Sequence, residues 1–369
     1  MLARILALIT KEFLTIFKDK RSRFLVIVPP IIQLLVFGYA ATFDLMRIKF
    51  AVYDEDKSSL SRELIAKFTG STHFKLVKEL NDSSEIEYLL DSRQVLMILH
   101  IGPLFSRRVI NENNAPVQVI VDGRNSNTAA ILLGYVNSII TDLNDKLFVD
   151  RYGRSLPLQL QNRSWFNPNL ESRWFIVPAL VGVLALVVVV LVTALSVATE
   201  REHGTFDQLL VAPFRPVEIL IGKSLPGVII GIFEASIILA LSILWFKIPF
   251  HGSLLILYGG LLVFLMSVVA MGLMISSFAV TQQQGLLGGF LFIIPSITLS
   301  GFATPIANMP ILMQKLTYFN PLRYFLVILR ATFLEGASFN ELIHQFWPMA
   351  LIGLVSFSLA GWMFRHRLY

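Results

Sequence analysis

The chain has 369 residues, of which 55% are hydrophobic and only 15% are charged, and its formal net charge is +6. A soluble globular protein has about 25% charged residues, so the composition indicates a membrane protein, and the basic excess lies at the ends of apolar stretches rather than on a nucleic-acid-binding surface. The absence of cysteine excludes disulfides and thiol catalysis, and the scattered histidines argue against a metal site.

Residues 1–23 precede the first apolar stretch and form an element of their own. Their apolar side chains share one face of a helix, and the other face carries Arg4, Lys11 and Lys18. This pattern predicts an amphipathic helix that lies in the membrane interface, against the lipid. The alternative is a cytoplasmic extension of the first span, but the polar run at 21–23 favours a break.

Six apolar stretches are long enough to cross a bilayer as helices, which takes about 20 residues each. Their predicted bounds are 24–43, 174–198, 224–246, 254–280, 284–302 and 346–364. The polar run Thr281-Gln282-Gln283-Gln284 divides the fourth from the fifth. The predicted fold class is therefore an α-helical polytopic membrane protein with six transmembrane helices and an inserted α/β domain.

Orientation follows from the Lys and Arg residues next to the spans. Placing the N-terminus in the cytoplasm puts eleven of these residues in the short inner segments and four in the short outer ones. Both termini, including the tail 365–369, are therefore expected in the cytoplasm. Residues 44–173 then lie outside, in the periplasm of a bacterium that has one.

Residues 44–173 carry 16 basic and 16 acidic residues and are predicted to form a separate α/β domain. Strands are predicted at Ile48–Tyr53, Val95–His100 and Val117–Val121, and helices at Ser59–Phe68, Ser83–Asp91 and Asn125–Leu147. Because strands and helices alternate, we expect a small sheet with crossover helices.

The polar loop 199–223 between the second and third spans is the most informative stretch. Four polar side chains stand at the membrane exit: Glu200, Arg201, Glu202 and His203. Gly204 permits a sharp turn, and Thr205 can cap a short helix with Leu209 and Leu210 on its apolar side. Such a helix could dock in a partner, or the stretch could be a plain connection.

The sequence Gly222-Lys223-Ser224 at the end of this loop is similar to the end of a phosphate-binding loop. That motif needs a glycine five residues before Gly222, and Val217 stands there. The strand–loop–helix context is also missing. The match is therefore a false positive, and any ATPase must be another chain.

Glu234 is the ionisable residue near the middle of the third span. An ionisable group at that depth is costly and usually faces the interior of the helix bundle. It is either a carboxylate that contacts substrate or takes part in proton movement, or a carboxyl group that packs against another span, for example against Gln33. The sequence leaves both open.

Several motifs, taken in order, resemble those of ABC-2 type permeases, the membrane subunits of ATP-binding-cassette exporters. They are Lys11-Glu12-Phe13, Trp165-Phe166-Asn167-Pro168, the loop TEREHGTFDQLLVAP at 199–213, Leu299-Ser300-Gly301-Phe302, and Asn320-Pro321-Leu322-Arg323-Tyr324-Phe325. The resemblance covers nearly the whole chain and is closest to the bacterial subgroup with a large external domain between the first two spans.

The resemblance implies a role for each of these segments. Residues 200–210 would form a coupling helix that meets the ATPase, with contributions from Glu200, Arg201, Glu202, His203, Gly204, Thr205, Asp207, Leu209 and Leu210, and the face of Lys11, Glu12 and Lys18 would help to hold that ATPase. Residues 303–345 would be a re-entrant and external segment. Glu234, Gln33 and Ser300 are the candidates for the substrate pathway.

The resemblance also implies the assembly and the location. The chain would not be an enzyme and would bind no cofactor, since ATP and magnesium belong to the ATPase subunits. A second permease chain, identical or related, would complete the transporter, and the external domain could dock a periplasmic adaptor. The protein would lie in the bacterial inner membrane and export a hydrophobic or amphipathic molecule, such as a drug, a lipid-like compound or an ion.

Two other functions are weighed against this one. A membrane-bound sensor with a ligand-binding external domain would need a cytoplasmic signalling domain, but every inner segment is short. A secondary transporter would need several intramembrane ionisable groups and an internal repeat. Only Glu234 is found, and no repeat is detected.

Overall fold

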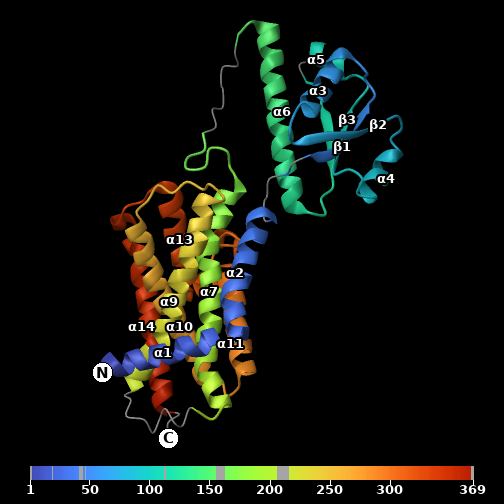
Figure 1. Cartoon of the computed structure of the whole chain (residues 1–369). Helices are drawn as coiled ribbons and strands as arrows, with labels where there is room; N and C mark the ends of the chain where they lie inside the picture. The colour runs from blue at the N-terminus through green and yellow to red at the C-terminus, as the bar shows by residue number, and fades with distance from the viewer. Residues whose placement is uncertain are drawn as a thin grey trace. The chain divides into compact units, whose positions relative to one another are not determined.

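The computed structural model describes residues 2–18, 20–40, 45, 47–111, 114–154, 163–205 and 216–366. Contacts divide the chain into two units, one made of Met1–Ala41 with Ser164–Tyr369 and the other of Thr42–Arg163. The first is helical and the second is α/β, as the sequence predicts (Figure 1).

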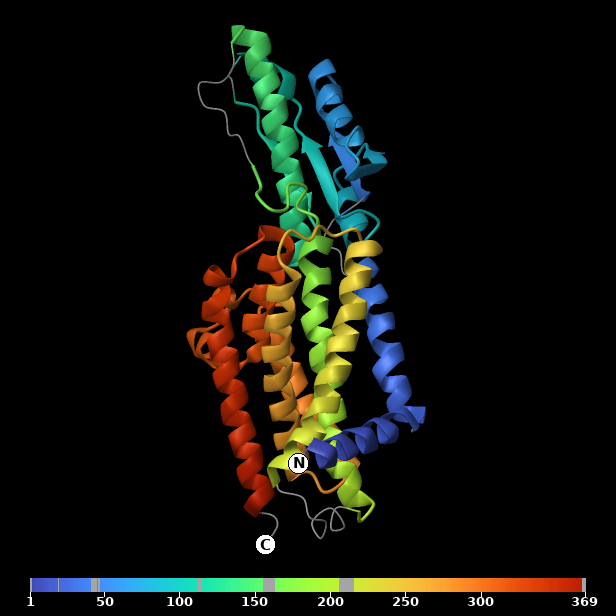
Figure 2. The same cartoon turned by 60° about the vertical axis from the view of Figure 1, so that its left-hand side comes forward.

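The helical unit is a bundle with one helix lying across its end. Its helices are α1 (Leu2–Lys18), α2 (Lys20–Ala40), α7 (Ser172–Glu202), α9 (Pro216–Leu244), α10 (Leu254–Phe278), α11 (Gln282–Thr298), α12 (Ile311–Leu316), α13 (Pro321–Arg330) and α14 (Phe339–His366). Figures 1 and 2 show α1 running across the end of the bundle where α7 ends and α9 begins.

Four of the described helices are long and apolar enough to cross a membrane. They are Ser172–Glu202, Val217–Leu244, Leu254–Phe278 and Phe339–Met363. The other two predicted spans correspond to α2, whose apolar part covers Val26–Tyr39, and to α11, which has 17 residues. The α11 helix ends four residues before the predicted 302, because Gly301 turns the chain with a φ of 85°.

The α7 helix is the centre of the unit. It is apolar all round and buried along almost its whole length, which is the pattern of a core helix. It packs against α2, α9, α10, α11 and α13. The sequence alone places α7 among six similar spans and does not single it out.

The α13 helix lies inside this bundle although it is too short to span a membrane. Asn320 caps its first turn and also donates a hydrogen bond of 2.7 Å to the carbonyl of Ser296. Phe325 is fully buried and stacks on Phe264 of α10 with ring centroids 4.5 Å apart. Backbone that does not span can lie at membrane depth only when it is packed in protein, and α13 meets that condition.

The α/β unit contains a four-stranded sheet with the order β2-β1-β3-β4. Its elements are β1 (Ile48–Asp54), α3 (Ser59–Thr69), β2 (Phe74–Leu80), α4 (Glu85–Asp91), β3 (Met97–Ile101), α5 (Phe105–Asn111), β4 (Val117–Val121) and α6 (Ser126–Tyr152). β1 is parallel to β2 and β3, and β4 is antiparallel to β3. Alternate residues of β1 enter cores on opposite faces of the sheet: Phe50 and Val52 on one, Ala51 on the other.

Candidate functional site

The candidate site lies where α1 meets the end of α7 and the start of α9. Lys223 of α9 is almost fully buried there, with 1% of its side chain exposed. Its Nζ lies 2.8 Å from Glu12 Oε1 of α1 and 3.1 Å from Glu200 Oε2 of α7. The same nitrogen donates a hydrogen bond of 3.2 Å to the carbonyl of Ser196. One lysine thus joins three helices.

A second lysine extends this cluster to the surface. Lys11 Nζ lies 2.7 Å from Glu200 Oε1, and the Lys11 side chain is 45% exposed. The Ser196 hydroxyl donates to the other oxygen of Glu12, at 3.1 Å. We call the four charges Lys11, Glu200, Lys223 and Glu12 the charge cluster. Their signs alternate and sum to zero, so each buried charge has an opposite partner, as burial requires.

Gly222 explains how α1 comes close enough to α9 for these ion pairs. A Cβ at this position would lie 2.7 Å from Leu8 Cβ of α1. A larger residue would therefore push the two helices apart. The dipeptide Gly222-Lys223 therefore has a structural role in joining α1 to α9, which its likeness to a phosphate-binding loop does not reveal. The signal was an unexplained lysine in the first turns of an apolar helix, which needs a counter-charge.

The end of α7 also holds the turn between α10 and α11. Arg201 donates hydrogen bonds to the carbonyls of Ser277, at 2.8 Å, and Ala279, at 3.1 Å. Glu202 Oε2 accepts a hydrogen bond of 2.6 Å from the backbone N–H of Gln282. A cation at the carbonyl end of α10 and an anion at the N-terminus of α11 are the signs that the helix dipoles favour.

The remaining predicted loop residues end α7 or lie outside the described part of the chain. His203 Nδ1 lies 2.7 Å from the Thr199 carbonyl, Gly204 turns the chain with a φ of 68°, and Thr205 bonds back to the Glu200 carbonyl. The predicted helix that begins at Thr205 and includes Asp207, Leu209 and Leu210 lies almost entirely in residues 206–215, which are outside the described part of the chain.

The outward face of α1 borders an open hollow of about 560 Å³. The residues along it are Ala7, Thr10, Lys11, Leu14, Thr15 and Lys18. Glu12 lies on the opposite face with only 9% of its side chain exposed, because it binds Lys223. The structure therefore separates the three residues predicted on one face: Lys11 and Lys18 point outward, whereas Glu12 points into the bundle.

The three candidates for the substrate pathway differ in their surroundings. Glu234 is 5% exposed, and neither of its carboxyl oxygens has a hydrogen-bond partner among the described residues. Gln33 of α2 is half-buried. The Ser300 hydroxyl donates to the Ile297 carbonyl at 2.7 Å and so forms part of the turn that ends α11. Within the described chain, no hydrogen bond joins Glu234 to Gln33.

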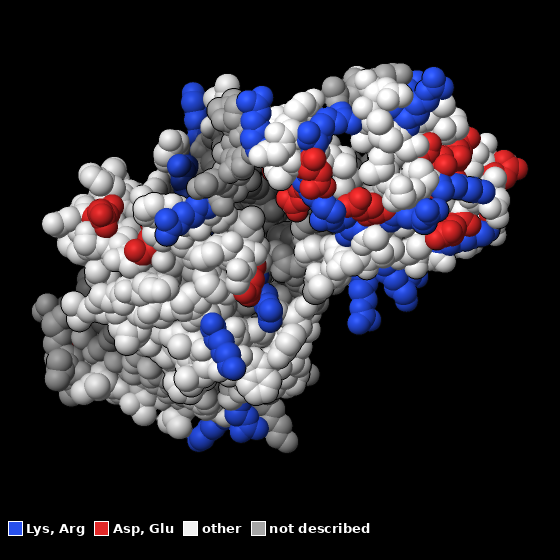
Figure 3. Space-filling model, turned by 90° about the horizontal axis from the view of Figure 1, so that it is seen from above, with Lys and Arg blue, Asp and Glu red and all other residues white. Residues whose placement is uncertain are grey.

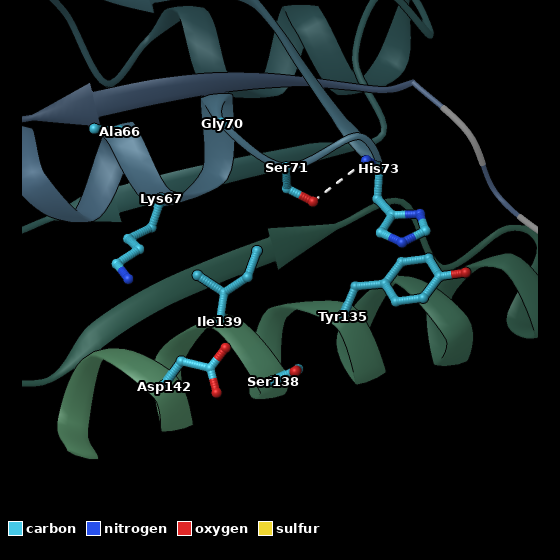
Figure 4. A pocket seen from close by; sticks show the side chains of 9 residues that line it. All are labelled: Ala66, Lys67, Gly70, Ser71, His73, Tyr135, Ser138, Ile139 and Asp142. Carbon is cyan, nitrogen blue, oxygen red and sulfur yellow. Dashed lines mark hydrogen bonds between the residues drawn. The ribbon is translucent and has the colours of Figure 1, made fainter. Parts of the chain in front are cut away.

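Two cavities of the α/β unit are larger than a third, of about 100 Å³, that lies at the start of α5. One, of about 460 Å³, lies between α3 and α6, and in Figure 4 the His73 ring stacks on Tyr135 at one end while Lys67 and Asp142 lie at the other. The other, of about 880 Å³, is mainly apolar and is lined by α3, α5, β4 and α6. Among the residues described, no group of His, Asp or Glu could hold a metal ion.

Charge is distributed differently over the two units. Figure 3, seen from above, shows acidic and basic side chains interspersed over the α/β unit, whereas most of the helical unit's surface on this face is uncharged. This contrast fits an aqueous environment for the α/β unit and an apolar one for the bundle.

His100 of β3 makes the stability of the α/β unit depend on pH. Partial burial lowers its pKa, but hydrogen bonds to Gln118 (3.0 Å) and Glu55 (2.9 Å) and the charge of Glu55 raise the pKa above its ordinary value overall. The stabilisation that protonated His100 gives to the folded α/β unit is therefore complete below about pH 6.5, and it is lost as the pH rises through the raised pKa of His100. We expect the unfolding temperature of this unit to fall between pH 6 and 8.5, and to fall less in His100→Gln. If the unfolding temperature fell with pH equally steeply in the parent and in His100→Gln, the result would contradict this prediction.

Comparison with known proteins identifies the class. The family model for ABC-2 family transporter proteins matches residues 20–362, so the chain belongs to this family. It is therefore a permease, the multi-pass membrane subunit of an ABC transporter whose ATPase is a separate protein. Members of the family usually bind no cofactor themselves.

Three relatives from Escherichia coli (strain K12) are similar over most of their length. YbhR, a probable multidrug ABC transporter permease, is 38% identical over 369 residues, all of both chains. YbhS, with the same description, is 32% identical over 90% of this chain and 89% of its own. The inner membrane transport permease YhhJ is 31% identical over 85% of this chain and 84% of its own. These matches confirm the resemblance found in the motifs.

Proposed function

We propose that this permease exports hydrophobic or amphipathic molecules, drug-like or lipid-like, from the cytoplasm, driven by ATP hydrolysis on partner subunits. The observation that supports the coupling part is the anchoring of the described segments on either side of residues 206–215. On one side Glu200, Arg201 and Glu202 bind neighbouring helices, and on the other Lys223 binds α1 and α7. A force applied to residues 206–215 would therefore be transmitted to five helices, namely α1, α7, α9, α10 and α11. The descriptions of YbhR and YbhS support the multidrug class.

The arrangement in the inner membrane that we propose has six spans, with both termini in the cytoplasm. Four helices span by length and composition, and we add α2 and α11 because both pack beside α7. The charge cluster then lies at the cytoplasmic end of the bundle, and α1 lies in the interface against the lipid. The predicted re-entrant and external segment 303–345 would end at 338, just before α14 begins, and the burial of α13 supports its re-entrant part.

The partners that we propose are two ATPase subunits, which hold ATP and magnesium, and a second permease chain, identical or related. The ATPase would contact the undescribed loop, including Asp207, Leu209 and Leu210, and the outward face of α1 with Lys11 and Lys18. The hollow along that face supports this contact. A periplasmic adaptor would dock on the α/β unit, which has its own hydrophobic cores.

The substrate pathway that we propose passes Glu234. A buried carboxyl group without a hydrogen-bond partner is expensive to keep, which favours a role over simple packing. Gln33 belongs to α2, a helix that packs against α9, the helix of Glu234. Ser300 is a weaker candidate because its hydroxyl is engaged in the α11 turn.

Co-purification tests the proposed function most directly. The chain is isolated from its native membrane, and we expect an ATPase in a one-to-one ratio with the permease. Arg201→Ala is expected to reduce the ATPase recovered, because it frees the end of α7 from the α10–α11 turn. A chain that carries no ATPase and still transports when driven by an ion gradient would establish the secondary transporter instead.

A further inference from the structure

We infer that Lys223 is a positioning residue for transport: it locks α1 to α7 and α9, so that the three helices move as one body when the coupling loop is pushed. This inference rests on the proposed contact between that loop and an ATPase. It concerns a residue outside the loop, buried in the bundle, and assigns a mechanical role to the N-terminal helix.

The geometry of the charge cluster carries the inference. The path Lys11–Glu200–Lys223–Glu12 starts on the exposed face of α1, crosses α7 and α9, and returns to the buried face of α1. The α1 helix is therefore held from two sides. Because the residues next to the undescribed loop belong to the same two helices, α7 and α9, a displacement of the loop acts on both anchors together.

The burial of these groups makes the lock stiff. Side-chain exposure is 1% for Lys223 and 9% for both Glu12 and Glu200. Water cannot replace a broken partner at such a site, so sliding α1 relative to α9 would strand a charge. The contact of Gly222 with Leu8 adds steric fit at the same level of the helix.

The alternative is that the charge cluster stabilises the fold and nothing more. A double variant, Glu12→Gln with Lys223→Met, separates the two roles. It removes one negative and one positive charge together and leaves the pair of Lys11 with Glu200, so no net charge is stranded. If the charge cluster only stabilises the fold, this neutral variant should behave like the parent. If it locks the helices, the lock should fail, because the buried ion pair between α1 and α9 is gone and, among the described ion pairs, only the longer one of Arg4 with Glu218, at 4.0 Å, still joins them.

The absence of cysteine in the chain allows a direct measurement. Spin labels are attached at Leu6→Cys on α1, which is 54% exposed, and Leu244→Cys at the far end of α9, which is 78% exposed. The 22 residues from Lys223 to the helix end at Leu244 make α9 a lever of roughly 30 Å, which amplifies any tilt. Electron–electron distance distributions are recorded for the purified chain and for its complex with the ATPase, with and without a non-hydrolysable ATP analogue.

We expect a narrow distribution in the parent and one at least twice as wide in the double variant, at an unfolding temperature within a few degrees of the parent. In the complex, nucleotide should leave the parent distance unchanged but alter it in the double variant, because α1 no longer follows α9. The control changes the exposed pair Glu63 and Lys146 of the α/β unit in the same way, to Gln and Met, and should match the parent.

A double variant as narrow as the parent, with and without nucleotide, would overturn the inference. Failure to recover an ATPase would instead contradict the proposed function, and the distribution in the isolated chain would still decide whether Lys223 locks α1 to α9.

Discussion

The single substitution Lys223→Met is expected to destabilise the helical unit by about 3–5 kcal/mol, the usual cost of breaking a buried ion pair from one side. Glu200 would keep its pair with Lys11, whereas Glu12 would keep only the hydrogen bond from the Ser196 hydroxyl among the described contacts; the side chains of both carboxylates are 9% exposed. The two carboxylates would repel each other without screening by water. Methionine has nearly the shape of lysine, so the loss of stability would come from removing the charge rather than from creating a cavity.

Thermal unfolding of the purified chain in lipid nanodiscs measures this effect, together with the amount of protein in the membrane. Lys146→Met is the matched control, because Lys146 pairs with Glu63 on the exposed surface of the α/β unit. Surface pairs contribute up to about 1 kcal/mol, so the control should shift little. If both variants shifted equally, Lys223 would not be paired as described.

The substitution Glu234→Leu is expected to act in the opposite direction and raise the stability by about 1–3 kcal/mol, the cost of a buried polar group without a partner. Leucine fills a similar volume and has no oxygen to satisfy. If Glu234 lies on the substrate pathway, export should fall in the same variant. Stability and function would then change in opposite directions at one position.

The measurement pairs unfolding temperature with export of a fluorescent cation such as ethidium from cells. Glu234→Gln separates charge from hydrogen bonding, because the amide keeps the shape and the polar atoms but has no charge. Glu234→Leu with lower stability than the parent would mean that the carboxyl group has a partner in the assembled transporter. Unchanged export by Glu234→Gln at several pH values would contradict a role in proton movement.

Much of the fold follows from the sequence because apolar length and strand–helix alternation are strong signals. The predicted helix 254–280 corresponds to α10, and the three predicted strands are all present. The β2 strand was missed because Phe74–Leu80 contains three charged residues and lies at the edge of the sheet, largely exposed. The α5 helix is not among the predicted elements, although its seven residues equal those of α4, which is predicted.

The candidate site was predicted only in part, because burial is a property of packing rather than of the local sequence. Glu12 and Lys11 are neighbours in the chain, yet one faces the bundle and the other faces outward. The sequence around Lys223 gives no indication of its counter-charge, which lies 211 residues away in the chain. Only the fold brings Glu12 and Lys223 together.

The order of the charge cluster along the chain has a consequence for biosynthesis. Lys11, Glu12 and Glu200 all leave the ribosome before Lys223. An unpaired lysine in an apolar helix makes membrane insertion unfavourable by about 2.5–3.5 kcal/mol at mid-depth, and by less near an end. When α9 enters the bilayer, both carboxylates that it needs are already at the membrane surface. The N-terminal helix can therefore serve as a counter-ion during insertion, before the transporter has been assembled.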